Sequence, residues 1–342
     1  MSKPLLGFFM MTMMTSGWSN AQERCGITAS LLRSGFERGE QPQTVILPAQ
    51  NTPLTLSVEY PTEGAVLNGA RIQLYGSFTG PANTGITVNN IQVAATNATK
   101  FTFAPIILSS GPQTLTITAK TMDGLTQTVT RNITVNKTGQ DLVRFSSLSK
   151  GGFAPFRGRF DLSTTLPAGQ SSAVRFEIDF DGDGAFEIDS PNSPASLSYE
   201  YQSAGVYLAR ARVTFDDAQT PTPVVVIEST FRIHADTIAF SRQTLCSVYY
   251  DMKHRLQAGQ IASAGNTLSP QIRTRFVTYW NANAASIPVT AGKLGEIMVG
   301  QISDISAHFQ VAIPIQGSPG QARGYPVLFA RSLDGVWRIS GM

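Results

Sequence analysis

The stretch that decides the fold is Asp179-Phe-Asp-Gly-Asp-Gly184, near the middle of a chain of 342 residues. Three carboxylates at alternate positions, with glycine at the sixth, can place oxygen ligands around a hard cation such as calcium. The residues around its start alternate, with Val174, Phe176, Ile178 and Phe180 on one face, as a half-buried β-strand requires. The acidic stretch is therefore predicted to be a loop that closes a strand in a β domain.

This acidic loop has two interpretations. As a calcium site, its side-chain ligands would be Asp179, Asp181, Asp183 and Asp189, with Glu187 as the alternative to the last. An EF-hand requires a bidentate glutamate at position twelve, where this chain has serine, so the site would be incomplete or built differently. The second interpretation is structural, because aspartate and glycine also make good β-turns without any ion.

Length and charge restrict the class of protein. A chain of 342 residues predicts two or three domains. The formal net charge is +3 and no run of Lys or Arg occurs, which argues against a nucleic-acid partner. Few charged residues and abundant Thr, Ser, Gly and Pro favour an extracellular β-rich protein.

The first 21 residues are predicted to be a secretory signal peptide. Lys3 provides the positive start, an apolar stretch runs from Pro4 to Met14, and small residues precede a cleavage site after Ala21. The alternative is a membrane anchor, but the apolar run is shorter than the ~20 residues that span a bilayer. We therefore expect an exported protein, periplasmic or extracellular, without a transmembrane segment after signal cleavage.

Cys25 and Cys246 are the two cysteines of the chain. In an oxidising compartment they can form a disulfide that joins the start of the mature chain to its last domain. Two separate free thiols remain the alternative, because the sequence does not show whether their Cα atoms come close enough.

Residues 22–50 have no sustained period and are predicted to be an N-terminal tether or a strap over a later domain. Residues 51–136 contain about seven strand-sized runs separated by turn signals, including Asn89-Asn90 and the hairpin signal Asp123-Gly124. That pattern predicts an immunoglobulin-like β-sandwich. The phrases Pro61-Thr-Glu-Gly-Ala-Val66 and Gly111-Pro-Gln-Thr-Leu115 resemble bacterial immunoglobulin-like repeats over residues 55–136, which implies a spacer or binding module.

Residues 143–235 are predicted to be a second sandwich that contains the acidic loop. Besides that loop, Gly152-Phe-Ala-Pro155 and Tyr201-Gln-Ser-Ala-Gly205-Val-Tyr207 resemble a PKD domain over residues 143–234. The resemblance implies a sandwich of the immunoglobulin type. A tryptophan common in that family just before the acidic loop is replaced by Ile178.

Residues 238–342 have a different pattern. Apolar residues at helical spacing predict an amphipathic helix over 238–257, and Ser269-Pro270 begins a second helix. The period then changes to two, ending in Asp334-Gly-Val-Trp-Arg-Ile339, so we predict helices packed on a curved antiparallel sheet. This order, with Leu256-Gln-Ala-Gly259 after the first helix, resembles the NTF2-like superfamily over residues 240–342.

A pocket in such a domain could in principle hold a catalytic site. Tyr249, Tyr250, Asp251 and His254 lie on or near the first predicted helix, and His308 lies on a strand. A His–Asp pair facing inward could act as a general base and its orienting group. The simpler interpretation is a solvated pair of Asp251 and His254, three residues apart on one helix.

The sequence as a whole predicts a mainly β, multidomain, exported protein without enzymatic activity. Its sandwiches would act as spacers or adhesive modules, and the C-terminal cone would bind a protein or small ligand. The expected partners are envelope or extracellular proteins or polysaccharides, with calcium as the one candidate cofactor. The alternative is an enzyme or small-molecule-binding protein that uses the NTF2-like pocket.

Overall fold

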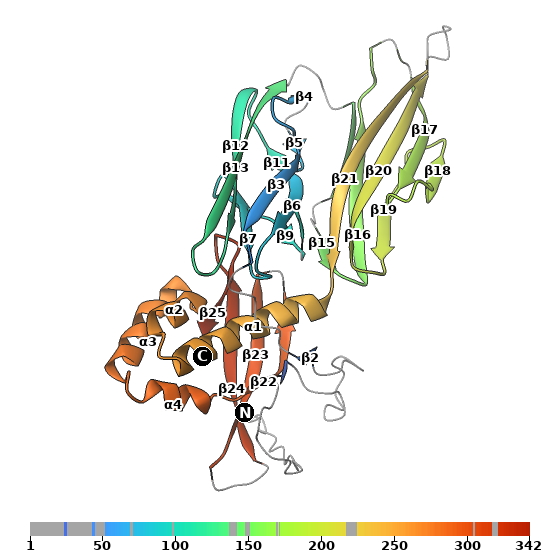
Figure 1. Cartoon of the computed structure of the whole chain (residues 1–342). Helices are drawn as coiled ribbons and strands as arrows, with labels where there is room; N and C mark the ends of the chain where they lie inside the picture. Colours follow the sequence, from blue (N-terminus) through green and yellow to red (C-terminus); the bar gives the residue numbers. More distant parts are fainter. Residues whose placement is uncertain are drawn as a thin grey trace, which may run out of the picture. The chain divides into compact units, whose positions relative to one another are not determined.

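The computed structural model describes residues 24–25, 43–44, 52–68, 71–97, 99–136, 142–147, 151–168, 170, 172–216, 224–303, 305–316 and 321–342. The predicted signal peptide lies outside these residues, as does most of the segment 22–50. Two compact units make up the chain: Gln50–Phe240 with Leu333–Val336, and Met1–Ala49 with Ser241–Ser332 and Trp337–Met342. The described part is mainly β, as predicted (Figure 1).

The first sandwich consists of two facing sheets. One contains, in spatial order, β3 (Thr55–Tyr60), β6 (Tyr75–Thr79), β10 (Lys100–Thr102) and β9 (Ala95–Thr96). The other contains β4 (Val66–Asn68), β13 (Thr126–Asn136), β12 (Gly111–Lys120), β7 (Gly85–Val88) and β8 (Gln92–Val93). A short pair, β5 (Arg71–Ile72) and β11 (Ile106–Ile107), stands beside them. The alternating apolar residues predicted from the sequence fill the space between the sheets, among them Leu74, Phe101, Phe103, Leu115 and Ile117.

Both turn signals in this sandwich lie between adjacent strands. Asn89 and Asn90 each have positive φ, of 50° and 56°, and connect β7 to β8. Asp123-Gly124 connects β12 to β13, with Gly124 at φ 89°. The second connection is longer than the two-residue hairpin that the sequence suggested, because the Thr121 amide bonds to the Leu125 carbonyl and leaves three residues between them.

The second sandwich has the same arrangement. One sheet contains β14 (Val143–Ser147), β16 (Phe156–Thr164) and β19 (Leu197–Tyr201). The other contains β15 (Gly151–Phe153), β21 (Val225–Asp236), β20 (Gly205–Asp216), β17 (Ser172–Asp179) and β18 (Ile188–Ser190). Its core includes Phe145, Phe160, Ile178, Phe180 and Tyr201.

The strand order supports an immunoglobulin-like fold for both sandwiches. In each, the first strand lies at the edge of one sheet, and the next strand pairs in parallel with the last strand of the other sheet. Each sandwich contains a cis-proline next to this strand: Pro61 lies between β3 and β4, and Pro155 lies between β15 and β16. With β4 and β15 left out of the count, the first, second and fifth strands form one sheet and the third, sixth and last form the other, as in the immunoglobulin sandwich.

A tyrosine corner closes the second sandwich. Tyr207, near the start of β20, donates its hydroxyl to the carbonyl of Ser203 at 2.8 Å, as this motif requires. Gly205 has no positive φ; instead a Cβ there would lie 3.2 Å from the ring of Tyr207. The glycine in this motif therefore makes room for the tyrosine ring.

The C-terminal unit consists of helices and an antiparallel sheet. The helices are α1 (Ile238–Gln257), α2 (Ile261–Ala264), the 3-10 helix η2 (Gly265–Thr267), α3 (Pro270–Ala282) and α4 (Ile287–Gly292). The strands are β22 (Glu296–Ile302), β23 (Ser306–Pro314), β24 (Ala322–Arg331) and β25 (Trp337–Gly341). Helix α1 crosses these strands in Figure 1. Both helices predicted from the sequence, α1 and α3, are confirmed. Among the described residues, no helix has the length and apolar character needed to span a membrane.

The start of the chain is part of this C-terminal sheet. Strand β1 (Arg24–Cys25) pairs in parallel with β22, and β2 (Gln43–Thr44) pairs with β1 at the edge. Cys25 and Cys246 form a disulfide between β1 and α1, with their Cα atoms 5.9 Å apart. The described residues of the segment 22–50 thus form two strands of the C-terminal sheet.

Candidate functional site

The acidic loop connects β17 to β18 at one end of the second sandwich. It begins where Asp179 ends β17 and reaches β18 at Ile188. Within the described residues, one group of carboxylates is close enough to hold a metal ion: Asp179, Asp181, Asp183 and Glu187, whose ligand atoms lie within 4.8 Å of one another. We therefore consider this loop as the candidate site.

Asp179 stabilises the conformation of the loop by accepting two backbone hydrogen bonds. Its side chain is fully buried, and its two oxygens accept hydrogen bonds from the amides of Gly182 at 2.6 Å and Gly184 at 3.1 Å. Both glycines have positive φ, of 79° and 96°, a conformation that glycine adopts without steric cost. The alternating Asp and Gly residues thus form the tight turn that the simpler interpretation predicted.

The other two aspartates also bond within the loop. Asp181 accepts the amide of Asp183 at 3.2 Å, and Asp183 accepts the amide of Ala185 at 2.7 Å. The second oxygen of Asp181 accepts the hydroxyl of Tyr199 from β19 at 2.8 Å. This hydrogen bond, together with burial of the phenol, raises the pKa of Tyr199 to about 12.

Glu187 completes the group of carboxylates. One of its oxygens accepts the amide of Phe180 at 2.7 Å. Burial and then the negative charges of Asp181 and Asp179 raise the pKa of Glu187 above its usual range. A divalent cation among these oxygens would reverse that effect, since it would favour the ionised form of each carboxylate.

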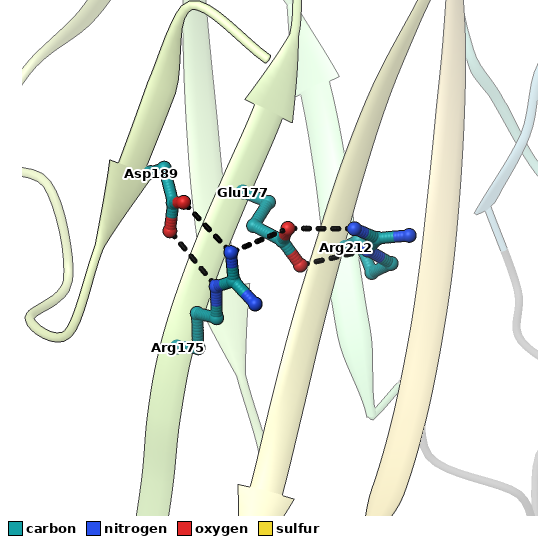
Figure 2. Close-up of polar contacts among 4 residues, drawn as sticks. All are labelled: Arg175, Glu177, Asp189 and Arg212. Carbon is teal, nitrogen blue, oxygen red and sulfur yellow. Dashed lines mark hydrogen bonds and ion pairs between the residues drawn. The ribbon is translucent and has the colours of Figure 1, made fainter. Parts of the chain in front are cut away.

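Asp189, the fourth ligand we assigned from the sequence, has a different partner. Figure 2 shows its carboxylate paired in a bidentate manner with Arg175, at 2.9 and 2.7 Å. Asp189 stands opposite Glu177 in the pairing of β17 with β18, which places it beside Arg175. The structure therefore puts Glu187, which the sequence offered as the alternative, with the other carboxylates.

An ion-pair ladder continues from Asp189 across the sheet. Arg175 lies 3.3 Å from Glu177, which forms a second bidentate pair with Arg212 at 2.7 and 2.6 Å (Figure 2). The guanidinium of Arg212 also lies over the ring of Phe186, within the acidic loop, 4.5 Å from its centroid. The ladder thus contacts the loop at Phe186 and the strand that follows it at Asp189.

The residues considered for catalysis lie in different environments. Tyr249 donates its hydroxyl to the Gly295 carbonyl at 3.0 Å, and the Tyr250 hydroxyl accepts the Ile297 amide at 3.3 Å. Asp251 is buried and pairs with Arg255, four residues later, at 2.8 Å. Asp251 is therefore buried where the sequence suggested a solvated side chain, and Arg255, one helical turn later, pairs with its carboxylate.

His308 lies on the opposite face of the sheet from the core. It is exposed on β23 between the buried residues Ala307 and Phe309, and its ring lies 3.4 Å from Gln310. Phe309 packs edge-on against Phe329 on the other face of the sheet. The structure thus does not bring His308 together with Asp251.

Sequence reasoning missed Tyr199 and Arg175 as neighbours of the acidic loop. Nothing in the sequence sets Tyr199 apart from other strand residues, yet its hydroxyl reaches Asp181 across the sandwich. An alternation of charge in Arg175, Glu177 and Asp189 was present in the sequence. The sequence alone does not show which of these charges are neighbours, because that depends on the strand register, which pairs β17 with β18 and with β20.

Comparisons with known proteins identify no family for this chain. No family model matches it, and no curated protein does. Among solved structures, the fibronectin(III)-like modules of Clostridium thermocellum CbhA match at 14% identity and a TM-score of 0.21, over 54% of this chain and 96% of theirs. The ICAM-5 D1–D4 ectodomain fragment matches at 10% identity and a TM-score of 0.23, over 54% and 52%.

A third solved structure is a SusE-like surface-located polysaccharide-binding protein from the heparin utilisation locus of Bacteroides thetaiotaomicron. It matches at 10% identity and a TM-score of 0.21, over 55% of this chain and 34% of that one. This chain thus spans about half of the ICAM-5 fragment and a third of the SusE-like protein. With such low TM-scores, the assignment of the immunoglobulin-like fold rests on the strand order of the chain itself.

Proposed function

We propose that this chain is an exported, non-enzymatic binding protein whose acidic loop takes up calcium. The observation that carries the calcium assignment is the group formed by Asp179, Asp181, Asp183 and Glu187, whose oxygens lie within 4.8 Å of one another. Oxygen-only donors of this charge suit calcium better than the softer transition metals, which prefer nitrogen or sulfur.

Calcium would act on the loop as a structural ion. Asp179 gives both oxygens to backbone amides, and Asp181 gives one to an amide and one to the hydroxyl of Tyr199. An ion would therefore use the further lone pairs of these oxygens together with those of Asp183 and Glu187. Burial is the first cause that raises the pKa of Glu187, and repulsion from the charges of Asp181 and Asp179 raises it further. A bound ion would relieve that repulsion and stabilise the end of the sandwich where the loop lies.

The two sandwiches serve as spacers or adhesive modules, and the C-terminal domain binds a protein or small ligand. The partners are envelope or extracellular proteins or polysaccharides. We assign the second sandwich to the PKD type, supported by the Tyr207 corner and the acidic loop. We assign the C-terminal domain to the NTF2-like type, supported by the order of helices before an antiparallel sheet.

The absence of enzymatic activity is part of the proposal. Supporting it, the interior of the C-terminal domain is occupied by large apolar side chains such as Phe309 and Phe329, and Asp251 is paired with Arg255. The export proposal is supported by the disulfide between Cys25 and Cys246, because such bonds persist in oxidising compartments.

Calorimetric titration of the chain from Gln22 onward with calcium tests the ion. We expect binding with a Kd of about 0.1–1 mM, the range of extracellular calcium modules. Glu187→Gln and Asp181→Ala should abolish the heat, while Asp189→Asn, which alters a carboxylate outside the group, should leave it unchanged. Equal binding by the Glu187→Gln chain, or loss of binding in Asp189→Asn alone, would show that the ligands are assigned wrongly.

Partner binding is tested with the complete chain on an array of bacterial polysaccharides and envelope proteins, with calcium and with chelator. A fragment starting at residue 238 is unsuitable as bait, because it would lack β1, β2 and the partner of Cys246. Retention of a defined polysaccharide or protein supports the binding role. Turnover of any of these molecules by the chain would refute the non-enzymatic assignment.

A further inference from the structure

The most specific unexplained contacts in the molecule lie between the two sandwiches. They connect Gln73, between β5 and β6, with Arg232 on β21, 159 residues later in the chain. Within the described residues, β15 pairs with β21 only over His234–Asp236. Arg232 thus lies two residues before the start of this pairing, and among the described residues no strand of its own sandwich pairs with it on that side.

The side chain of Gln73 makes the two hydrogen bonds with the Arg232 backbone that a neighbouring strand would make. Its side-chain oxygen accepts the Arg232 amide at 2.6 Å, and its side-chain nitrogen donates to the Arg232 carbonyl at 2.7 Å. A carboxamide carries one acceptor and two donors, so it can satisfy the same two groups that a paired peptide would satisfy. Its nitrogen also reaches the Phe103 carbonyl of the first sandwich, at 3.3 Å.

The side chain of Arg232, in turn, contacts residues of the first sandwich. Its guanidinium lies 3.6 Å from the ring centroid of Tyr75, which in turn stacks on Tyr60 at 5.5 Å. The same guanidinium lies 3.3 Å from the carboxylate of Glu59, whose other oxygen pairs with Lys100 at 2.6 Å. These pairs hold the pKa of Glu59 below its usual range, first through Lys100 and then through Arg232.

From this geometry we infer that Gln73 and Arg232 lock the two sandwiches into one rigid body. Domains joined by a short linker move independently by default, unless their interface is specific enough to stop them. Here a bidentate pair with the Arg232 backbone prevents sliding, and the Arg232 guanidinium over the ring of Tyr75 prevents rotation about that pair. The inference goes beyond the proposed binding function and holds whatever the chain binds.

The two halves of the joint can be removed separately. Gln73→Ala removes the pairing with the Arg232 backbone and leaves the stacked guanidinium in place. Arg232→Ala does the opposite, because the backbone groups that Gln73 contacts remain. Gln127→Ala is the matched control, since it removes an exposed glutamine from a strand of the first sandwich.

The test is the distance distribution between spin labels at Thr134→Cys and Glu200→Cys, exposed positions on the two sandwiches, in the complete chain from Gln22. We expect one narrow distribution for the parent and for Gln127→Ala. Each joint variant should broaden it, and the double variant by about twofold or more, as expected for domains freed to move. Circular dichroism of every variant checks that both sandwiches remain folded.

Three results would overturn the inference. The first is a broad distribution in the parent chain, which would mean that the sandwiches move despite these contacts. The second is a double variant that is folded and as narrow as the parent. The third is equal broadening by Gln127→Ala, which would show that the change does not depend on the joint.

Discussion

Gly182 and Gly184 stand two residues apart in the acidic loop, both with positive φ, and differ in what surrounds them. A Cβ on Gly182 would lie 2.7 Å from the carbonyl oxygen of Leu208, whereas a Cβ on Gly184 would meet nothing within 4 Å. A substitution of Gly184 therefore tests only the need for positive φ, whereas a substitution of Gly182 also tests the close approach of the Leu208 backbone.

Alanine at each position measures these two requirements. Gly184→Ala should reduce the free energy of unfolding by about 1–2 kcal/mol, the cost of a side chain in the left-handed region. Gly182→Ala should cost more, since the Leu208 backbone would also have to move. Urea unfolding followed by tyrosine fluorescence measures both changes, and equal losses would contradict the steric account.

The hydrogen bond between Tyr199 and Asp181 has a direct readout in the titration of the phenol. Asp181→Asn should lower the pKa of Tyr199 from about 12 toward its ordinary value of 10.0, because it removes the largest cause of the shift. A raised pKa stabilises the folded state below pH 10, and this contribution is lost as pH rises through about 12.

Ring-carbon NMR of labelled tyrosine measures this titration. Asp183→Asn is the control, because Asp183 contributes the smallest of the effects on Tyr199. An unchanged phenol pKa in Asp181→Asn would mean that the hydrogen bond is not formed in solution.

At the scale of elements, the Asp189–Arg175–Glu177–Arg212 ladder joins three strands of one sheet, β18, β17 and β20. Glu177 is 3% exposed and lies between two arginines that remain partly exposed. Hydrogen bonding to Arg212 is the largest cause that holds the pKa of Glu177 below its usual range. Its contribution to stability is therefore present above the ordinary glutamate pKa and is lost as pH falls through the lowered value.

Glu177→Gln should reduce the stability of the second sandwich by about 1–3 kcal/mol at neutral pH, as for a lost hydrogen bond to a charged group. It should also reduce the loss of stability in acid, because the titrating group is gone. Asp189→Asn, at the exposed end of the ladder, should have a smaller effect. Denaturation from pH 7 down to about pH 3 tests both, and parallel curves for parent and Glu177→Gln would refute the assignment.

Many of the strands and the two longer helices could be predicted from the sequence, because their residue patterns are local. Alternating apolar residues around Ile178 and Leu115 located buried strands, and Ser269-Pro270 located the start of α3. Helices α2 and α4 were missed because four and six residues are too few to show a helical period. The partner of Asp189 was missed because it depends on strand register, which distant parts of the sheet determine.

At the scale of the whole molecule, the disulfide joins residues 221 positions apart while both of them belong to one unit. Its removal should therefore affect the C-terminal unit and leave the sandwiches unchanged. Trp280 and Trp337, both in that unit, provide a selective fluorescence signal in the chain from Gln22.

Replacing both cysteines by serine should lower the stability reported by tryptophan by about 2–4 kcal/mol, the usual effect of a native disulfide. The unfolding transition of the sandwiches, followed by NMR at the rings of Tyr199 and Tyr207, should not move. A shift of both transitions together would contradict the division into two units, and no shift in either would mean that the bond does not stabilise the domain.

The pairing of β1 with β22 also sets an order of events in the export that we propose. Translocation from the N-terminus delivers Cys25 first, but its strand neighbour and its thiol partner arrive only with the last third of the chain. The C-terminal sheet can therefore be completed only after its last strands have followed, although β1 is delivered first. A chain interrupted before residue 246 would keep a free thiol at Cys25, a chemical mark by which incomplete copies differ from finished ones.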